Sequence, residues 1–114
     1  MNQPRQLDSV LYALIHKEDI SAFNREKPKD TVIDFRDGDF RGLDLRNLDA
    51  TGIDFSGAYF RAADLRGLDL RDVPLEGASI AHAQISGAYF PPELSADEIL
   101  MSVKFGTRMR YRTR

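Results

Sequence analysis

Residues 33–52 read IDFRDGDFRGLDLRNLDATG, and residues 53–72 repeat the pattern as IDFSGAYFRAADLRGLDLRD. From Phe35 to Phe90 every fifth residue is apolar, because a five-residue unit runs twelve times without an insertion. Five residues turn an α-helix by about 500°, so these positions would not share a helix face. A step of five also changes the face of a strand, where side chains alternate every two residues. The apolar positions are Phe35, Phe40, Leu45, Ala50, Phe55, Phe60, Leu65, Leu70, Leu75, Ile80, Ile85 and Phe90.

Each unit predicts two inward side chains, one outward side chain between them, and a two-residue corner. Another apolar or small residue lies two positions before each central residue, Asp commonly precedes the central residue, and Arg often follows it. Gly or Asn, which tolerate left-handed backbone, often occupies the corner. Four such sides close a coil of twenty residues, and stacked coils would pair at a spacing of about 4.8 Å. The sequence therefore predicts an all-β quadrilateral solenoid of three coils.

The twenty-residue superperiod also predicts which side chains stack. Ile33 is expected beside Ile53 on the inside, and Asp44 beside Asp64 on the outside. All the central residues except Ala50 are expected to form the structural core, with neighbouring bulky side chains filling the space that Ala50 leaves.

The ends of a solenoid need covers, because terminal coils expose apolar cross-sections and unpaired backbone. Residues 1–30 are expected to form a helical N-terminal cap, with Asp8 or Ser9 as the helix N-cap. Ile20 and Phe23 indicate a second helical turn before the repeats, which span residues 31–92. The apolar face of the first helix is expected to consist of Leu7, Val10, Leu11, Leu14 and Ile15.

Residues 93–114 are expected to form a C-terminal capping helix and a basic tail, within the same structural domain. Pro91-Pro92 ends the repeats, since proline donates no ladder hydrogen bond. The stretch Ser95-Ala96-Asp97-Glu98 predicts a capping box, and Gly106 predicts the end of the helix. The helix either only covers the last coil or also docks a partner. Its expected apolar face consists of Ile99, Leu100 and Val103.

The units Ala63-Asp64-Leu65-Arg66-Gly67 and Leu43-Asp44-Leu45-Arg46-Asn47 resemble the A(D/N)LXX unit of the pentapeptide-repeat protein family. The resemblance covers residues 33–92 and implies a right-handed quadrilateral β-helix. The sequence departs from the consensus in two ways. Leu, Ile or Val often replaces the Ala of the unit in the first half, and the Asp position decays after Leu70. The family implies a fold more firmly than a function, because its solenoids serve several unrelated roles.

The composition limits the class of protein. The chain has 114 residues, which suits one domain, and a net charge of −2. It contains no cysteine, so a disulfide, a thiol nucleophile and a cysteine metal site are excluded. No stretch approaches the roughly 18 apolar residues of a membrane span. Because residues 1–5 also lack the design of a signal peptide, we expect a cytoplasmic protein.

The side chains that usually carry chemistry are sparse. His16 is expected to be solvated, and His82 occupies a corner without neighbouring metal ligands. Stacked carboxylates such as Asp44 and Asp64 form a geometry that elsewhere holds a cation or transfers protons. Here an Arg follows two positions after each, so a neutralised outer surface is favoured. We therefore expect no catalytic residues, no metal and no cofactor, and a protein that is not an enzyme.

Three features are candidates for recognition. One is a pair of outward tyrosines, which stand one and a half coils apart and so on opposite faces. The second is the pair of Arg columns, Arg41/Arg61 and Arg46/Arg66/Arg71, whose field the flanking Asp residues would weaken. The third is the basic tail, which either packs on the protein or contacts an anionic partner. The apolar surface of the C-terminal helix is a further candidate, for contact with a partner or a second copy. The candidate residues are Tyr59, Tyr89, Ile99, Met101, Phe105, Arg108, Arg110 and Arg112.

Three functions follow as expectations. The first is a scaffold or protein-interaction module whose partner is unknown. The second comes from the resemblance, since some pentapeptide-repeat proteins resemble B-DNA and bind DNA gyrase. Three coils give a rod of about 15 Å, which matches only about four base pairs, so this function requires a homodimer. A homodimer is expected through a solenoid end or the C-terminal helix. The third function is binding of nucleic acid or another anionic partner through the tail.

Overall fold

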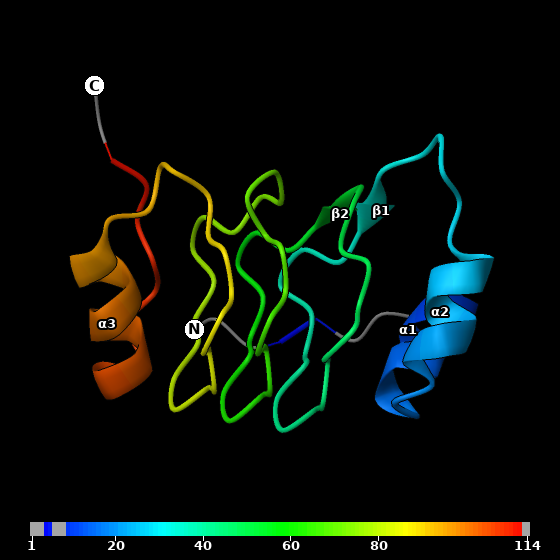
Figure 1. Cartoon of the computed structure of the whole chain (residues 1–114), viewed down its shortest axis with the longest axis horizontal. Coiled ribbons are helices and arrows are strands. Elements are labelled where there is room, and N and C mark those ends of the chain that lie inside the picture. The colour runs from blue at the N-terminus through cyan, green and yellow to red at the C-terminus, as the bar shows by residue number, and fades with distance from the viewer. Residues whose placement is uncertain (1–3, 6–8, 113–114) are drawn as a thin grey trace.

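The computed structural model describes residues 4–5 and 9–112. Figure 1 shows the repeats as a stack of turns with helices at both ends. The molecule measures 35 × 27 × 25 Å. Of the expected features, Leu7, Asp8 and Arg114 lie outside the described residues. The elements are α1 (Val10–His16), α2 (Ile20–Glu26), β1 (Ile33–Asp34), β2 (Ile53–Asp54) and α3 (Ala96–Phe105).

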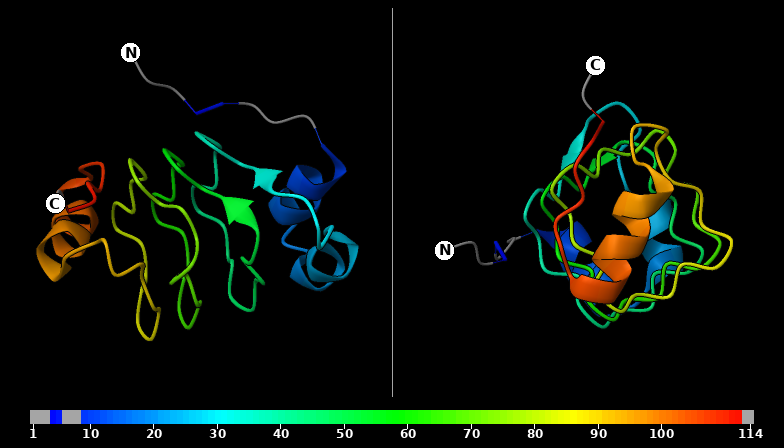
Figure 2. Two further views of the ribbon diagram at one scale, coloured as in Figure 1. Left: turned by 90° about the horizontal axis from the view of Figure 1, so that it is seen from above. Right: turned by 90° about the vertical axis from the view of Figure 1, so that its left-hand side faces the viewer.

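The repeat region winds with a period of twenty residues. Strands β1 and β2 are parallel, and Ile33 lies beside Ile53. Single parallel bridges continue this register on the other sides, for example between Asp44 and Asp64. Both pairings are the ones that the superperiod predicts. We name residues 33–52, 53–72 and 73–92 the first, second and third coil; Figure 2 shows them nearly superimposed when the stack is viewed along its axis.

The all-β expectation is correct only in part. β1 and β2 contain two residues each, and the other repeat contacts are isolated bridges within the described residues. Each side of a coil offers about three extended residues before the corner, so a ladder between neighbouring coils ends after one or two pairs. The three helices at the ends make the fold a mixed one.

The corners adopt left-handed backbone, as the Gly and Asn positions predict. The φ angle is 71° at Gly57 and 70° at Asn47. A Cβ at Gly57 would overlap the carboxylate of Asp37 and would carry a positive φ angle, so this corner favours glycine. Ala62 and His82 adopt the same conformation, with φ angles of 60° and 56°.

Aromatic side chains fill the first two coils. The rings of Phe35, Phe40, Phe55 and Phe60 pack with centroids 5.1–6.0 Å apart. These side chains are almost completely buried, with no more than 2% of their surface exposed. The inward column of phenylalanines therefore forms the hydrophobic centre of the stack.

Two of the expected core residues, Ile85 and Phe90, are only partly buried. The sequence predicts both in the structural core beneath the C-terminal helix, but that helix leaves each of them partly exposed. The equivalent residues one coil earlier, Leu65 and Leu70, are 2% and 3% exposed because the third coil covers them. Nothing within the described residues covers Ile85 and Phe90 as completely.

Side chains of the N-terminal helices close the first coil. The Tyr12 hydroxyl donates to the carbonyl of Asp39 at 3.0 Å. The Asn24 amide oxygen accepts the backbone N–H of Asp49 at 2.9 Å, and Lys27 donates to the carbonyl of Thr51. These bonds replace the partners that a preceding coil would supply.

Two further contacts complete this end of the stack. The Glu18 carboxylate accepts the backbone N–H of Asp44 at 2.6 Å. The backbone N–H of Arg5 donates to the carbonyl of Asp37, also at 2.6 Å. Each of the four sides of the first coil therefore has at least one hydrogen bond to the N-terminal segment.

The helix α3 begins and ends where the sequence predicts. The Ser95 hydroxyl accepts the backbone N–H of Glu98 at 3.2 Å, and Gly106 ends the helix with a φ angle of 73°. The predicted capping box is only half formed, because the Glu98 carboxylate binds Arg110. The apolar face also differs from the expected one, since Leu100 is 50% exposed while Ser102 is buried.

Candidate interaction surface

The outer surface of the coils carries paired Asp and Arg side chains. The Arg46 guanidinium donates to both oxygens of Asp44, at 2.9 and 2.7 Å. One oxygen of Asp44 also accepts the backbone N–H of Arg46 at 3.1 Å. The hydrogen bonds of Arg46 lower the pKa of Asp44 to about 2. The same two-point pairing recurs between Asp34 and Arg36, Asp39 and Arg41, Asp64 and Arg66, and Asp69 and Arg71.

These pairs leave little free charge on the surface that they cover. Arg46 also lies 3.3 Å from Asp64 in the next coil, which links two neighbouring pairs. Within residues 4–5 and 9–112, no group of His, Asp or Glu side chains is arranged to hold a metal ion. The geometry of the Asp columns therefore suits neutralisation by Arg rather than cation binding.

The two histidines make backbone contacts. Nε2 of His16 lies 2.7 Å from the carbonyl oxygen of Asp39, although the side chain is exposed. His82 is also exposed, and its backbone N–H donates to the carbonyl of Val103 at 2.9 Å. His16 thus joins the helix α1 to the first coil, and His82 joins the third coil to the helix α3.

The tail packs on the third coil as an extended segment. The backbone N–H of Met109 donates to the carbonyl of Ala78 at 2.8 Å, and its carbonyl accepts the N–H of Gly77 at 2.7 Å. The Met109 side chain is fully buried. The Tyr111 hydroxyl accepts the N–H of Leu75 at 2.9 Å, which fixes the direction of the tail. The tail therefore runs antiparallel to the third coil and bonds to its backbone at Gly77 and Ala78.

The side chains of Arg108 and Tyr59 bind each other and attach the tail to the second coil. The guanidinium of Arg108 lies 4.9 Å from the centre of the Tyr59 ring and donates to the Tyr59 hydroxyl at 2.5 Å. It also donates to the carbonyls of Gly57 and Gly77, at 3.3 and 2.6 Å. These two candidate residues thus bind each other.

The other tail arginines differ in their surroundings. Arg110 pairs with Glu98 at 2.8 Å, and this contact lowers the pKa of the Glu98 carboxyl. The backbone N–H of Arg112 donates to the carbonyl of Glu93 at 2.9 Å, while its side chain is exposed. The tail is therefore not a free basic arm.

Tyr89 lies in a different column from Tyr59. It pairs with Asp69 across the coils, whereas Tyr59 pairs with Asp39 and Ser79. The guanidinium of Arg71 lies 4.9 Å from the Tyr89 ring centre, yet 58% of Tyr89 is exposed. The two tyrosines do not form one aromatic patch.

The helix α3 exposes apolar side chains at the C-terminal end. Met101 is 42% exposed and Phe105 is 76% exposed, and Leu100 adds to them. Ile99 and Val103 instead pack partly buried against the core. Of the residues predicted on this helix, Met101 and Phe105 lie at the surface and Ile99 lies largely beneath it.

Sequence reasoning missed Ser102 as a contact residue. Its hydroxyl accepts the backbone N–H of Ile80 at 3.0 Å and donates to the carbonyl of Thr107 at 2.6 Å. A polar residue beside Ile99 and Val103 on the expected apolar face was the available signal.

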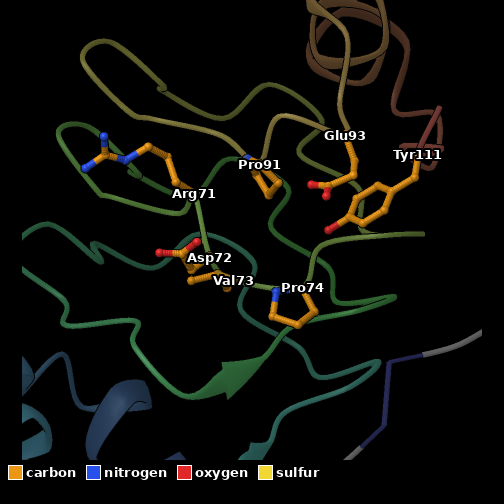
Figure 3. Close-up of a pocket in the computed structure, with 7 residues that line it drawn as sticks. All are labelled: Arg71, Asp72, Val73, Pro74, Pro91, Glu93 and Tyr111. Atoms are coloured by element: carbon orange, nitrogen blue, oxygen red, sulfur yellow. The ribbon is translucent and has the colours of Figure 1, made fainter.

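An open pocket of about 300 Å³ lies where the second coil, the third coil and the tail meet. Figure 3 shows the Glu93 carboxylate and the Tyr111 hydroxyl turned toward the same space, with Asp72 across from them. Burial raises the pKa of the Tyr111 hydroxyl, and the nearby charge of Glu93 adds to this. The pocket is lined by Arg71, Asp72, Val73, Pro74, Pro91, Glu93 and Tyr111.

Comparison with known families identifies the repeats. The model of the family described as pentapeptide repeats (8 copies) matches residues 39–77 and 53–90. The repeat region of the chain therefore belongs to the pentapeptide-repeat family. The comparisons with curated proteins and with solved structures gave no match. Among the described residues, no helix is long and apolar enough to cross a membrane.

Proposed function

We propose that the protein is a non-enzymatic scaffold that binds another protein through the C-terminal end of its repeat stack. As its architecture we infer the right-handed quadrilateral β-helix of three coils that its family implies. The pairing of residues twenty positions apart supports this architecture. The observation that carries the function is the apolar surface of Leu100, Met101 and Phe105 on α3.

Affinity capture from the native host tests this function. The double variant Met101→Lys and Phe105→Lys places two charges on the proposed contact surface. As a matched control, Val10→Lys and Val32→Lys make the same change at exposed apolar residues elsewhere, which are 76% and 70% exposed. We expect the first variant to lose a partner that the parent protein and the control retain. Equal capture by all three proteins would contradict the proposed surface.

A homodimer through α3 is the second candidate, and the same exposed side chains favour it. Closed two-fold pairs are the commonest oligomers, and one such pair would cover Met101 and Phe105 in both copies. Light scattering across a hundredfold dilution measures the mass directly. A strict monomer at all concentrations would exclude the homodimer.

The DNA-mimic alternative depends on that homodimer, because three coils span only about 15 Å. The Asp–Arg pairs neutralise much of the surface. Asp54 instead accepts the backbone N–H of Ser56, and Asp49 accepts that of Thr51 and lies 3.6 Å from the Lys27 ammonium. A supercoiling assay with DNA gyrase tests this alternative, since a mimic should inhibit the enzyme and a scaffold should not.

Binding of nucleic acid through the tail is the third alternative. Such binding would need the arginine side chains of the tail. Two of them already have partners in the protein, because Arg108 contacts Tyr59 and Arg110 contacts Glu98. Chromatography on heparin distinguishes the cases. A tail-driven binder should be retained at low salt, while the proposed scaffold should pass through.

A further inference from the structure

One stretch of the third coil presents unpaired backbone at the C-terminal end. In the second coil, the N–H groups of Leu65 and Leu70 donate to the carbonyls of Gln84 and Tyr89, at 2.9 and 2.8 Å. The corresponding N–H groups of the third coil, twenty residues later, have no partner among residues 4–5 and 9–112. The same holds for the carbonyls of Ala83 and Ala88, whose counterparts one coil earlier are paired. The N–H groups without a partner are those of Ile85, Gly87 and Phe90.

The hydrophobic core is open at the same place. Ile85, Ala88 and Phe90 point inward in the repeat pattern, but each is only partly buried. Their counterparts in the second coil are at most 3% exposed. An edge that lacks both its hydrogen bonds and its apolar cover is the kind of edge to which an extended peptide adds as a strand.

The protein itself shows what covers such an edge. On the neighbouring sides of the third coil, the tail supplies Met109 as a buried apolar residue with two backbone hydrogen bonds. Basic residues flank it, and Arg108 binds carbonyl groups and an aromatic ring outside the core. The tail then leaves the coil at Arg112, which bonds to Glu93. Its described part therefore leaves the edge at residues 84–90 uncovered.

The surface beside the open edge favours a cation. Asp72 and Glu93 line the pocket together with Pro91, the residue that follows Phe90 in the chain (Figure 3). Neither carboxylate has an ion-pair partner among the described residues, and Arg71 in the same pocket is paired with Asp69. A segment that alternates apolar and basic residues fits both the open core and this acidic corner.

We propose that residues 84–90 bind a segment of a partner protein that pairs with their backbone on both sides of the corner at Gly87 and bends with that corner. The segment presents an apolar residue to Ala88 and Phe90 and a Lys or Arg to Asp72 and Glu93. This inference rests on the proposed function and names its docking mode. The partner is thus recognised by main-chain pairing and by alternation of apolar and basic side chains.

A synthetic peptide with the sequence of residues 106–112, GTRMRYR, is the probe, because it copies the segment that covers the neighbouring edge. The experiment adds it to the full-length, isotope-labelled protein and follows amide exchange by NMR. We expect the amides of Ile85, Gly87 and Phe90 to gain protection at least about tenfold, with no change at Leu65. A control peptide with Asp in place of Met and Glu in place of each Arg should have no effect.

Variants of the protein test the acidic corner. Asp72→Lys with Glu93→Lys should weaken binding of the peptide about tenfold at low salt and less at high salt. The control Glu26→Lys with Asp30→Lys makes the same charge change at exposed residues near the N-terminal helices. It should bind the peptide as the parent does.

Each other outcome would overturn the proposal. If millimolar peptide protects none of the three amides, the edge does not bind such a segment. If the variant Asp72→Lys with Glu93→Lys binds the peptide as tightly as the control variant does, Asp72 and Glu93 do not recognise a basic side chain of the segment. If the amides are protected before peptide is added and lose protection on dilution, a second copy occupies the edge. If the parent and the variant Asp72→Lys with Glu93→Lys capture a partner protein equally well, this docking mode is wrong. The proposed scaffold function would not be affected by that result.

Discussion

Replacing Phe55 with Ala tests how the core holds the coils together. The Phe55 side chain is 1% exposed, and its ring packs 5.1 Å from that of Phe60 and 5.2 Å from that of Phe40. Removing a buried phenyl ring typically lowers the free energy of unfolding by about 3–5 kcal/mol, through lost transfer energy and the cavity that remains. The total stability of a small domain is about 5–15 kcal/mol, so this loss is a large part of it.

Thermal unfolding followed by circular dichroism measures the effect. For a chain of this length, about 3–5 kcal/mol should lower the Tm by about 10–30 °C. Val32→Ala is the control, since Val32 is 70% exposed and its removal should change the Tm little. Phe55→Asp, which buries an unpaired charge, should leave no folded protein. If Phe55→Ala or Phe55→Asp melts within about two degrees of the parent, the inward register of Phe55 is wrong.

Three further predictions concern the ends and the surface. Ser102→Ala should destabilise the protein by about 1–3 kcal/mol, because the buried N–H of Ile80 loses its acceptor; an unchanged melting curve would refute that role. Ser95→Ala removes the N-cap of α3 and should cost about 1 kcal/mol in urea unfolding, with no cost expected if the cap is unimportant. The Arg pairs hold the pKa of Asp44 and Asp69 at about 2, below the value near 4 of an unfolded Asp. Their contribution is therefore complete above about pH 5 and is lost as the pH falls to about 2, and a stability that stays flat over this range would contradict it.

The repeat period predicted the stack because twelve units in register leave one geometry that points every central residue inward. It placed Ile33 beside Ile53 and put Gly57 at a corner, since both follow from spacing and from backbone sterics. The predicted ends of the C-terminal helix are also confirmed, because the signals for them are local. Ser95 and Gly106 bound α3 because capping depends on residues a few positions away.

The features that the sequence did not predict depend on partners far along the chain. The Glu98 carboxylate accepts hydrogen bonds from Arg110 and does not cap the helix as predicted. The Ser102 hydroxyl accepts the backbone N–H of Ile80. The tail was left between packing and extending into solvent, because alternation alone does not name a partner for Met109. The open core at Phe90 depends on how far α3 reaches across the coil, which local patterns do not encode.

The central claim is that the stack is closed at its N-terminal end and open along residues 84–90. Residue-by-residue amide exchange on the free protein tests this claim most directly. We predict slow exchange at Asp44 and Asp49, whose N–H groups are bonded to Glu18 and Asn24. We predict that the amides of Ile85 and Phe90 exchange at least about tenfold faster than those of Asp44 and Asp49, after correction for intrinsic rates. Protection of Ile85 and Phe90 equal to that of Leu65 and Leu70 in a monomeric protein would contradict the account.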